Sequence, residues 1–281
     1  MSQTSKIFEA DDGLPASEVG VWACEKHDYL SRYLNISRKA RQKFLSGRAK
    51  SATFVDLFCG SGRARIRNTN EWVDGSAVAA WKISRKGEAP FSTVYISDID
   101  PTLRSACAER LRRLGAPVVE LEGDAVAAAK QYVQAVNEYG LNFAFIDPFS
   151  LGTLSFEIIQ TLSQLKRIDM LIHFSKMDHQ RNLGLNLTSE KSDFDALVPG
   201  WRDRIDQNRP MPDVRRQIFE LWRDMVAEVG LDPSLDVKLI TGSRNQHLYW
   251  LLIVAKHQLA LKFWKEATAN EAQGNFFGSL L

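Results

Sequence analysis

The stretch Phe54-Val55-Asp56-Leu57-Phe58-Cys59-Gly60-Ser61-Gly62 decides how the rest of the chain is interpreted. A short apolar run predicts a buried strand, Asp56 ends it, and a glycine turn follows that predicts the start of a helix. Glycines let the backbone turn tightly and come close to a ligand. Amide groups at the start of a helix can hold an anionic or polar ligand. The stretch therefore predicts a ligand-binding corner, with an ordinary strand-turn-helix connection as the alternative.

The glycine spacing does not fit a nicotinamide dinucleotide site. Such a site needs a third Gly or Ala where this chain has Arg65, and an acid about 20 residues further on. The next acid at a strand end is Asp98, which is too far away. The pattern instead resembles motif I of S-adenosylmethionine (SAM) dependent methyltransferases, especially those that act on nucleic acids. The resemblance is carried by Asp56, Phe58, Gly60 and Gly62.

Length and composition are those of an ordinary globular protein. The 281 residues are 44% apolar and 25% charged, and the net charge is +2. A nucleic-acid partner would therefore need local basic patches rather than overall charge. Three scattered cysteines and five histidines form no metal-ligand spacing, and we expect no metal. No apolar run is long enough to span a bilayer, and the acidic N-terminus does not resemble a signal peptide, so we expect a cytoplasmic location.

Strand and helix patterns alternate from residue 51 onward. This predicts an α/β fold with a doubly wound, mostly parallel, seven-stranded Rossmann-like sheet. Residues 237–241 and 248–255 predict a C-terminal β-hairpin. We expect an N-terminal helical extension at 1–50 and a methyltransferase-like domain at 51–281. A helical insertion is expected at about 176–230, where the alternation breaks.

Acids follow four consecutive predicted strands. They are Asp56, Asp98 with Asp100, Asp124 and Asp147. In an open α/β sheet, ligands bind outside the carboxyl ends of the strands. Asp98 or Asp100 could accept the ribose hydroxyls of SAM, and Asp124 the adenine amino group. Each acid alone could equally be a helix N-cap.

Asp147-Pro148-Phe149 resembles motif IV of amino-methyltransferases, without its second proline. That difference weakens a prediction of adenine-N6 or cytosine-N4 chemistry. Asp147 could still accept a proton from a target amine, and Phe149 could stack on a flat ring. Core packing is the alternative for Phe149. No Pro-Cys pair occurs here, which argues against a covalent cysteine adduct.

Basic residues predict a phosphate-binding patch at the mouth of this site. They are Lys26, Arg63, Arg65 and Arg67, with a further basic stretch at 32–50. Solvent-facing ion pairs and a solvated helix face are the alternatives. His173, at the end of a predicted strand, is interpreted as a satisfied polar residue.

Together these segments resemble the three-Cys-motif partner family, proteins with a methyltransferase-like domain that are named for a neighbouring radical-SAM-like protein. The resemblance extends over most of residues 20–180. Besides the motifs above, it rests on Trp22, Lys26-His27, Tyr33-Leu34, Gly75-Ser76 and 171–175. It implies a SAM-binding fold and a three-Cys partner protein, and it implies no substrate.

The sequence thus predicts a SAM-dependent methyltransferase that acts on nitrogen or oxygen of a substrate, with nucleic acid as the expected class. One rival is a non-catalytic SAM- or nucleotide-binding partner of the radical-SAM-like protein. Another is a different reaction on the same fold.

Overall fold

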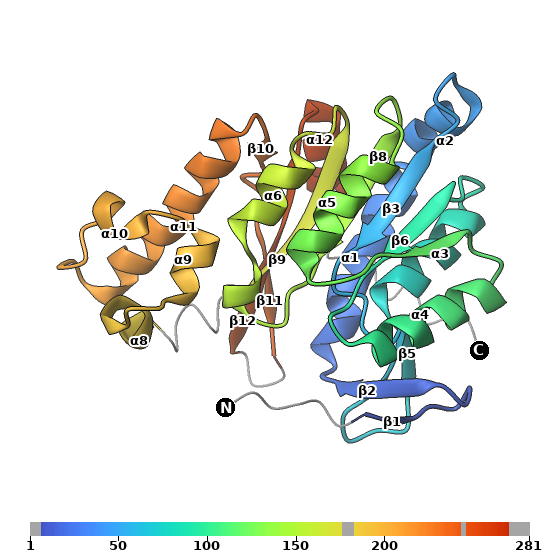
Figure 1. Cartoon of the computed structure of the whole chain (residues 1–281), viewed down its shortest axis with the longest axis horizontal. Helices are drawn as coiled ribbons and strands as arrows, with labels where there is room; N and C mark the ends of the chain where they lie inside the picture. The colour runs from blue at the N-terminus through green and yellow to red at the C-terminus, as the bar shows by residue number, and fades with distance from the viewer. Residues whose placement is uncertain (1–6, 176–182, 243–245, 270–281) are drawn as a thin grey trace.

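The computed structural model describes residues 7–175, 183–242 and 246–269. It contains one large mixed sheet covered by helices on both faces, and a smaller sheet at one end of the molecule (Figure 1). The strands of the large sheet are, in spatial order, β7 (Val118–Glu120), β6 (Thr93–Ile96), β3 (Ala52–Asp56), β8 (Leu141–Ile146), β9 (Ile168–Ser175) and β12 (His247–Ala255), with β11 (Lys238–Thr241) and β10 (Asp232–Pro233) both paired to β12.

The prediction of a doubly wound, mostly parallel Rossmann-like sheet is confirmed. Strands β7, β6, β3, β8 and β9 run parallel, and β12 is antiparallel to β9. Strands β11 and β12 form the predicted hairpin. The two-residue strand β10 adds an eighth member that the sequence did not indicate.

Strand β3 shows why this sequence gives a central parallel strand. All five of its residues are buried. Phe54 packs into the core on one face of the sheet and Val55 into the core on the other. Strands buried on both faces are typical of parallel sheets that helices cover twice.

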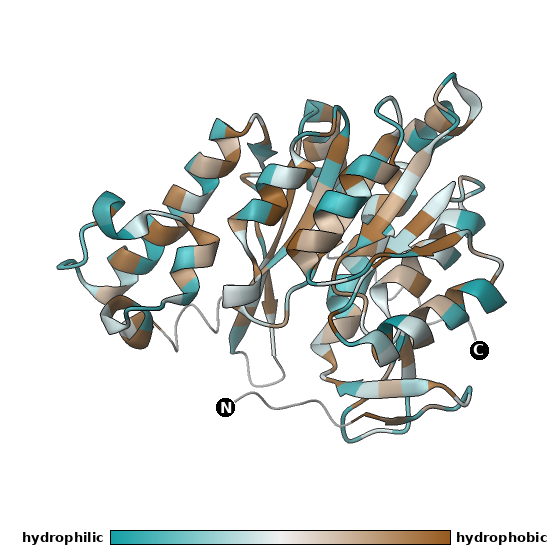
Figure 2. Ribbon diagram, in the orientation of Figure 1, coloured by the Kyte–Doolittle hydropathy of each residue, from teal (hydrophilic) through white to brown (hydrophobic). Residues whose placement is uncertain are grey.

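Two groups of helices cover the two faces. The face that receives Phe54 is covered by α1 (Trp22–Ile36), α3 (Ser76–Lys86), α4 (Pro101–Arg113) and α12 (Gln258–Ala269). The face that receives Val55 is covered by α5 (Ala125–Ala135), α6 (Phe156–Leu162) and α11 (Met211–Glu228). The short 3₁₀ turn η1 (Leu151–Thr153) packs on the same face. Figure 2 shows hydrophobic residues along the central strands and hydrophilic residues on outward helix faces.

The segment predicted as a helical insertion is helical where it is described. It holds α8 (Leu183–Thr188), α9 (Asp193–Leu197), α10 (Trp201–Arg204) and α11, which lie together at one end of the molecule (Figure 1). Trp201 and Trp222 are fully buried within this group and in its contact with the sheet. The predicted start of the insertion, at residue 176, lies outside the described residues. Among the described helices, none is long and apolar enough to cross a membrane.

The N-terminal 50 residues are less helical than expected. Besides α1 and α2 (Arg38–Ser46), they contain β1 (Phe8–Glu9) and β2 (Pro15–Val19). These strands form the smaller sheet with β4 (Arg63–Ile66) and β5 (Trp72–Asp74). The glycine turn is therefore followed by a strand and not by the predicted helix. Residues 63–74 make a hairpin, and helix α3 begins only after Gly75.

Strand order places a topological switch point at β3. The chain moves from β3 to β6 and β7 on one side, and then crosses to β8 on the other side. In the register of the sheet, Asp56 pairs with Ile96 of β6 and with Phe145 of β8. The residues that follow these strands therefore meet at one edge, the carboxyl edge, where ligands bind in folds of this kind.

Candidate functional site

The glycine turn at the end of β3 requires glycine at two positions for different reasons. Both Gly60 and Gly62 have positive φ, at +54° and +77°. A Cβ on Gly62 would lie 2.9 Å from Sγ of Cys107, so helix α4 packs directly on this residue. A Cβ on Gly60 would meet nothing within 4 Å. Gly62 is thus needed for packing, whereas Gly60 leaves open space above the backbone where a ligand can approach.

Asp56 supports this turn from below. It is fully buried and its two oxygens accept hydrogen bonds from within the chain. The amide of Phe58 donates at 3.1 Å and the hydroxyl of Ser76 donates at 2.5 Å. Burial raises the pKa of Asp56 to about 7, against the lowering effect of these two donors. Asp56 therefore ties β3 to the start of α3 and does not face the open side of the turn.

Asp98, after β6, closes the turn from the side. Its Oδ2 accepts from the amide of Gly60 at 2.9 Å, and its Oδ1 accepts from the amide of Asp100 at 2.9 Å. Burial raises the pKa of the Asp98 carboxyl above its ordinary value. Each carboxylate oxygen has two lone-pair sites, so both keep capacity for a ligand hydroxyl. Ile99, beside it, is 75% exposed and offers an apolar surface.

Asp100 and Asp124 act as helix caps. Asp100 accepts from the amides of Thr102 and Leu103 at the start of α4. Asp124 is exposed and accepts from the amide of Ala127 at the start of α5, at 2.8 Å. These contacts match the helix-cap alternative for Asp100 and Asp124. Of the two acids predicted to hold the ribose, Asp98 is therefore better placed than Asp100.

Asp147, after β8, is the centre of a charged cluster. The ammonium group of Lys26 on α1 forms an ion pair with its Oδ2, and Nδ1 of His173 on β9 lies 2.5 Å from its Oδ1. Burial would raise the pKa of Asp147, but Lys26 and His173 together hold it below its ordinary value. Asp147 is therefore ionised at neutral pH, within a cluster whose side chains are only about 15% exposed.

The ionised carboxylate determines the tautomer of His173. Because an ionised carboxylate only accepts hydrogen bonds, Nδ1 of His173 must donate to it. The other ring nitrogen, Nε2, is then the one that can accept a proton. Tyr249 of β12 packs on the imidazole with ring centroids 4.0 Å apart, and its hydroxyl donates to the carbonyl of Trp22. The ring is thus fixed from two sides.

Phe149 does not pack into the core. It is 72% exposed, whereas Pro148 before it is buried. The core-packing alternative for Phe149 is therefore wrong. Its ring lies two residues beyond Asp147 and is available to a ligand.

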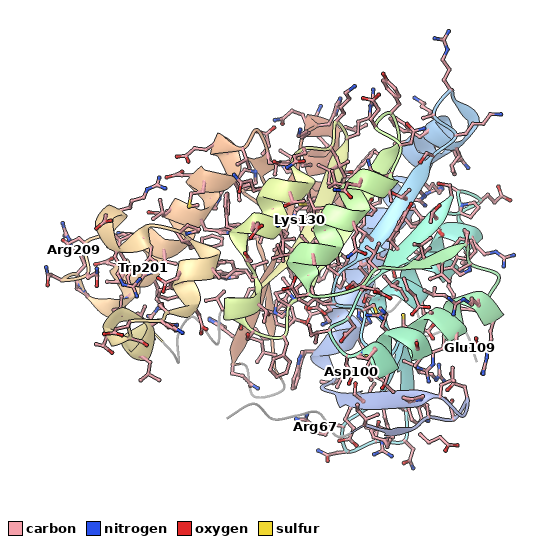
Figure 3. All side chains as sticks on the ribbon, in the orientation of Figure 1. Arg67, Asp100, Glu109, Lys130, Trp201 and Arg209 are labelled. Atoms are coloured by element: carbon pink, nitrogen blue, oxygen red, sulfur yellow. The ribbon has the colours of Figure 1, made fainter. Side chains whose placement is uncertain are left out.

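The predicted basic patch is largely neutralised by acids. Lys26 pairs with Asp147, Arg63 pairs with Asp11 and Asp74, and Arg65 pairs with Glu18 at 2.5 Å. Arg63 and Arg65 lie on β4 of the smaller sheet, not on a helix. Arg67 is exposed beside that sheet (Figure 3). These four side chains do not form one open cationic surface.

Four side chains at this edge were missed or placed differently in the sequence interpretation. They are Ser76, Ile99, His173 and Tyr249. His173 was interpreted as a satisfied polar residue, and its hydrogen bond with Asp147 agrees with that interpretation. It lies on β9, next to β8, so strand order places it beside Asp147. Tyr249 pairs with Ser175 across β9 and β12, a neighbour relation that the sequence does not reveal.

Comparison with known proteins gives structural matches only. No family model matches the chain, and no curated protein matches its sequence. Among solved structures, TYW2 of M. jannaschii in complex with AdoMet aligns over 91% of this chain and 86% of its own, with 12% identity and a TM-score of 0.43. An O-methyltransferase from Bacillus cereus in complex with SAH aligns over 83% of this chain and 81% of its own, with 12% identity and a TM-score of 0.48.

The buried carboxyl of Asp56 predicts a specific dependence of stability on pH. Its pKa is about 7 in the folded chain and 3.8 ordinarily, so the folded chain binds an extra proton between pH 4 and 7. The proton that the folded chain holds on Asp56 stabilises the fold below pH 4, and this stabilisation is lost as pH rises toward 7. The asparagine of Asp56→Asn does not titrate. The free energy of unfolding of this variant, relative to that of wild type, should therefore rise by about 2–4 kcal/mol between pH 4 and pH 7. Urea unfolding at pH 4, 5.5 and 7 measures the difference.

Asp124→Asn is the matched control, because it removes an exposed carboxylate that caps a helix. Its stability should stay parallel to that of wild type in this window. If the Asp56→Asn curve also runs parallel to wild type, Asp56 is not the buried proton-binding group.

Proposed function

We propose that the chain is a SAM-dependent methyltransferase that transfers a methyl group to nitrogen or oxygen of its acceptor, with nucleic acid as the acceptor class. One observation carries the proposal: the open glycine turn with Asp98 and the Asp147 cluster follow strands that flank the switch point. A cofactor site and a site for proton transfer would thus lie side by side at one edge of the sheet.

The residues of the turn fit SAM. Gly60 has no side chain and no neighbour within 4 Å of its Cβ position, which leaves room for the cofactor against the backbone. Asp98 would hold the ribose hydroxyls on its remaining lone pairs, and Ile99 would lie against the adenine ring. Asp124 and Asp100 would contribute at the edge of this site, and Asp56 would support it from beneath. SAM, when bound, supplies a methyl group on a positively charged sulfur.

The Asp147 cluster would serve the acceptor. An acceptor nitrogen or oxygen loses a proton when it gains a methyl group, and Nε2 of His173 would take that proton. Asp147 would orient the imidazole and stabilise its protonated form, and Lys26 would keep Asp147 ionised. Alignment of the acceptor in a site closed to water supplies the remainder of the acceleration.

Phe149 supports a flat acceptor such as a nucleobase. Its exposed ring next to the cluster could stack on a base, which is worth about 1–3 kcal/mol. The contribution of Arg67 and the basic stretch at 32–50 to phosphate binding remains part of this proposal, whereas Arg63 and Arg65 would first have to leave their ion pairs.

We further propose membership of the three-Cys-motif partner family, and with it a radical-SAM-like three-Cys protein as partner. One observation favours a non-catalytic role in such a pair: both oxygens of Asp147 are already engaged, and Phe149 replaces the second proline of the amino-methyltransferase motif. Methyl transfer measured with and without the partner protein separates the two roles.

Cofactor binding is the first test of the proposal. Calorimetric titration of the full chain with S-adenosylhomocysteine should give a micromolar Kd, about −8 kcal/mol. Asp98→Ala should weaken binding at least 30-fold, because the ribose loses its acceptor and the Gly60 amide loses its partner. Asp11→Ala, which removes a carboxylate paired to Arg63 in the smaller sheet, is the control and should bind as wild type does. Absence of binding to wild type would overturn the proposed cofactor.

Methyl transfer is the second test, with tritiated SAM and total RNA or single-stranded DNA as acceptor. Asp147→Asn and His173→Asn should each lower the rate by about 10²–10⁴, the usual contribution of a positioned acid or base. Both variants should bind S-adenosylhomocysteine within threefold of wild type, because neither residue holds the cofactor. Full activity in His173→Asn would exclude it as the base. Transfer by wild type to neither polymer, despite cofactor binding, would reject nucleic acid as acceptor.

A further inference from the structure

A cavity lies at the edge of the sheet opposite the candidate site, where the parallel strands begin. Its volume is about 370 Å³, within the range of small-molecule sites. The walls come from the starts of β3, β8 and β9, from the end of α1, from α2, and from the first turns of α12. We call it the amino-edge cavity. Five aromatic side chains line it: Tyr33, Phe44, Phe91, Phe143 and Phe263.

Arg41 of α2 is the unusual member of this lining. Only 2% of it is exposed. Its Nε donates to the carbonyl of Ala89 at 2.7 Å and its Nη1 to the carbonyl of Leu34 at 3.1 Å. Its Nη2 is buried and has no hydrogen-bond partner in the described chain. The guanidinium lies over the ring of Phe91, 4.8 Å from its centroid.

The charge of Arg41 is not compensated by a carboxylate. Within the described ranges no acid forms an ion pair with it. Burial lowers its pKa to about 10, which still leaves the group charged at neutral pH. A buried cation with a free donor is costly unless an anion or acceptor meets it. The uncompensated charge of Arg41 therefore favours an anion in the cavity that this residue lines.

The other charged groups of the lining also favour an anion. Lys166, Arg167 and Lys256 line the cavity together with Arg41, against one carboxylate, that of Asp169. The hydroxyl of Tyr33 donates to Asp169 at 2.8 Å, and burial raises the pKa of Asp169 to about 6. Lys166 is paired with Glu138, whereas Lys256 has no ion pair among the residues that the structure describes. Cations thus exceed acids in an otherwise aromatic cavity.

We propose that the amino-edge cavity binds a small organic anion, a carboxylate or phosphate monoester on an aromatic body, whose charge is balanced by the guanidinium of Arg41. The ligand's ring packs among the aromatic walls, and Lys256 adds positive charge. This site is separate from the proposed methyltransferase site, because the two lie at opposite ends of β3 and β8.

Calorimetric titration of the full chain with 1-naphthoate and with 1-naphthyl phosphate tests the proposal. The control ligand is 1-naphthalenemethanol, which has the same ring system but carries no charge. At least one anion should bind with a Kd below 1 mM, and the alcohol should bind at least tenfold more weakly. The two anions together tell whether a carboxylate or a phosphate ester is preferred. Binding should persist in the presence of saturating S-adenosylhomocysteine.

Three variants locate the site. Ala40→Trp fills the cavity without removing a charge, and Arg41→Met removes the guanidinium; each should weaken anion binding at least tenfold. Lys39→Ala removes an exposed cation next to Arg41 that does not line the cavity, and it should bind as wild type does. If Arg41→Met fails to fold, the affinity of Ala40→Trp alone decides whether the anion binds in this cavity.

The proposal is overturned if wild type binds neither anion, if the neutral alcohol binds as tightly, or if Ala40→Trp binds as wild type does. It is also overturned if Lys39→Ala loses as much affinity as Ala40→Trp, because binding would then reflect surface charge. Competition by S-adenosylhomocysteine would place the anion at the carboxyl edge instead.

Discussion

The contact between Gly62 and Gly75 is the constraint on which the carboxyl edge depends. The amide of Gly75 donates to the carbonyl of Gly62 at 2.8 Å, and a Cβ on Gly75 would lie 2.8 Å from Cα of Gly62. Glycine is therefore required at position 75 for the two backbones to approach so closely, whereas Gly62 is required by its contact with helix α4. The hairpin of residues 63–74 can therefore leave the glycine turn and return to the same place. Helix α3 then starts directly after Gly75, and Ser76 at its first position reaches Asp56.

Largely buried charges link helix α1 to the carboxyl edge of the sheet. Lys26 on α1, Asp147 after β8 and His173 on β9 come from three different elements and are all largely buried. Removing one partner of a buried ion pair costs about 3–5 kcal/mol, because the other charge is left uncompensated. The cluster therefore holds α1 against the sheet as well as giving Asp147 its charge. The stability of the fold and the proposed proton transfer would then depend on the same contacts.

Much of the fold could be predicted from the sequence, because its signals are local. The buried run at 54–58, the alternation of strands and helices, and the acids at strand ends are each visible within a few residues. The hairpin of residues 63–74 was missed because β4 is only four residues long and finds its partners in β2 and β5, one of them near the N-terminus. A strand that pairs with distant residues leaves little mark on its own sequence.

The site could be predicted only in part for the same reason. The sequence places Asp56, Gly60, Gly62, Asp98 and Asp147 at the carboxyl edge because each ends or follows a strand. Which of them support the turn and which remain open to a ligand depends on burial and hydrogen bonds. Lys26 was interpreted as a phosphate contact because a single lysine on a helix gives no sign of its partner. Its ion pair with Asp147 joins residues 121 positions apart. The partner of His173 is likewise set by strand order, so the sequence alone did not identify it.

The most direct test of the central claim, that the carboxyl edge is one active site, is a crystal structure of the chain with S-adenosylhomocysteine. The account predicts the ribose hydroxyls on Asp98, the cofactor backbone across Gly60, and the sulfur on the side that faces Asp147 and His173. A ligand bound elsewhere, or one whose sulfur points away from Asp147 and His173, would contradict the account.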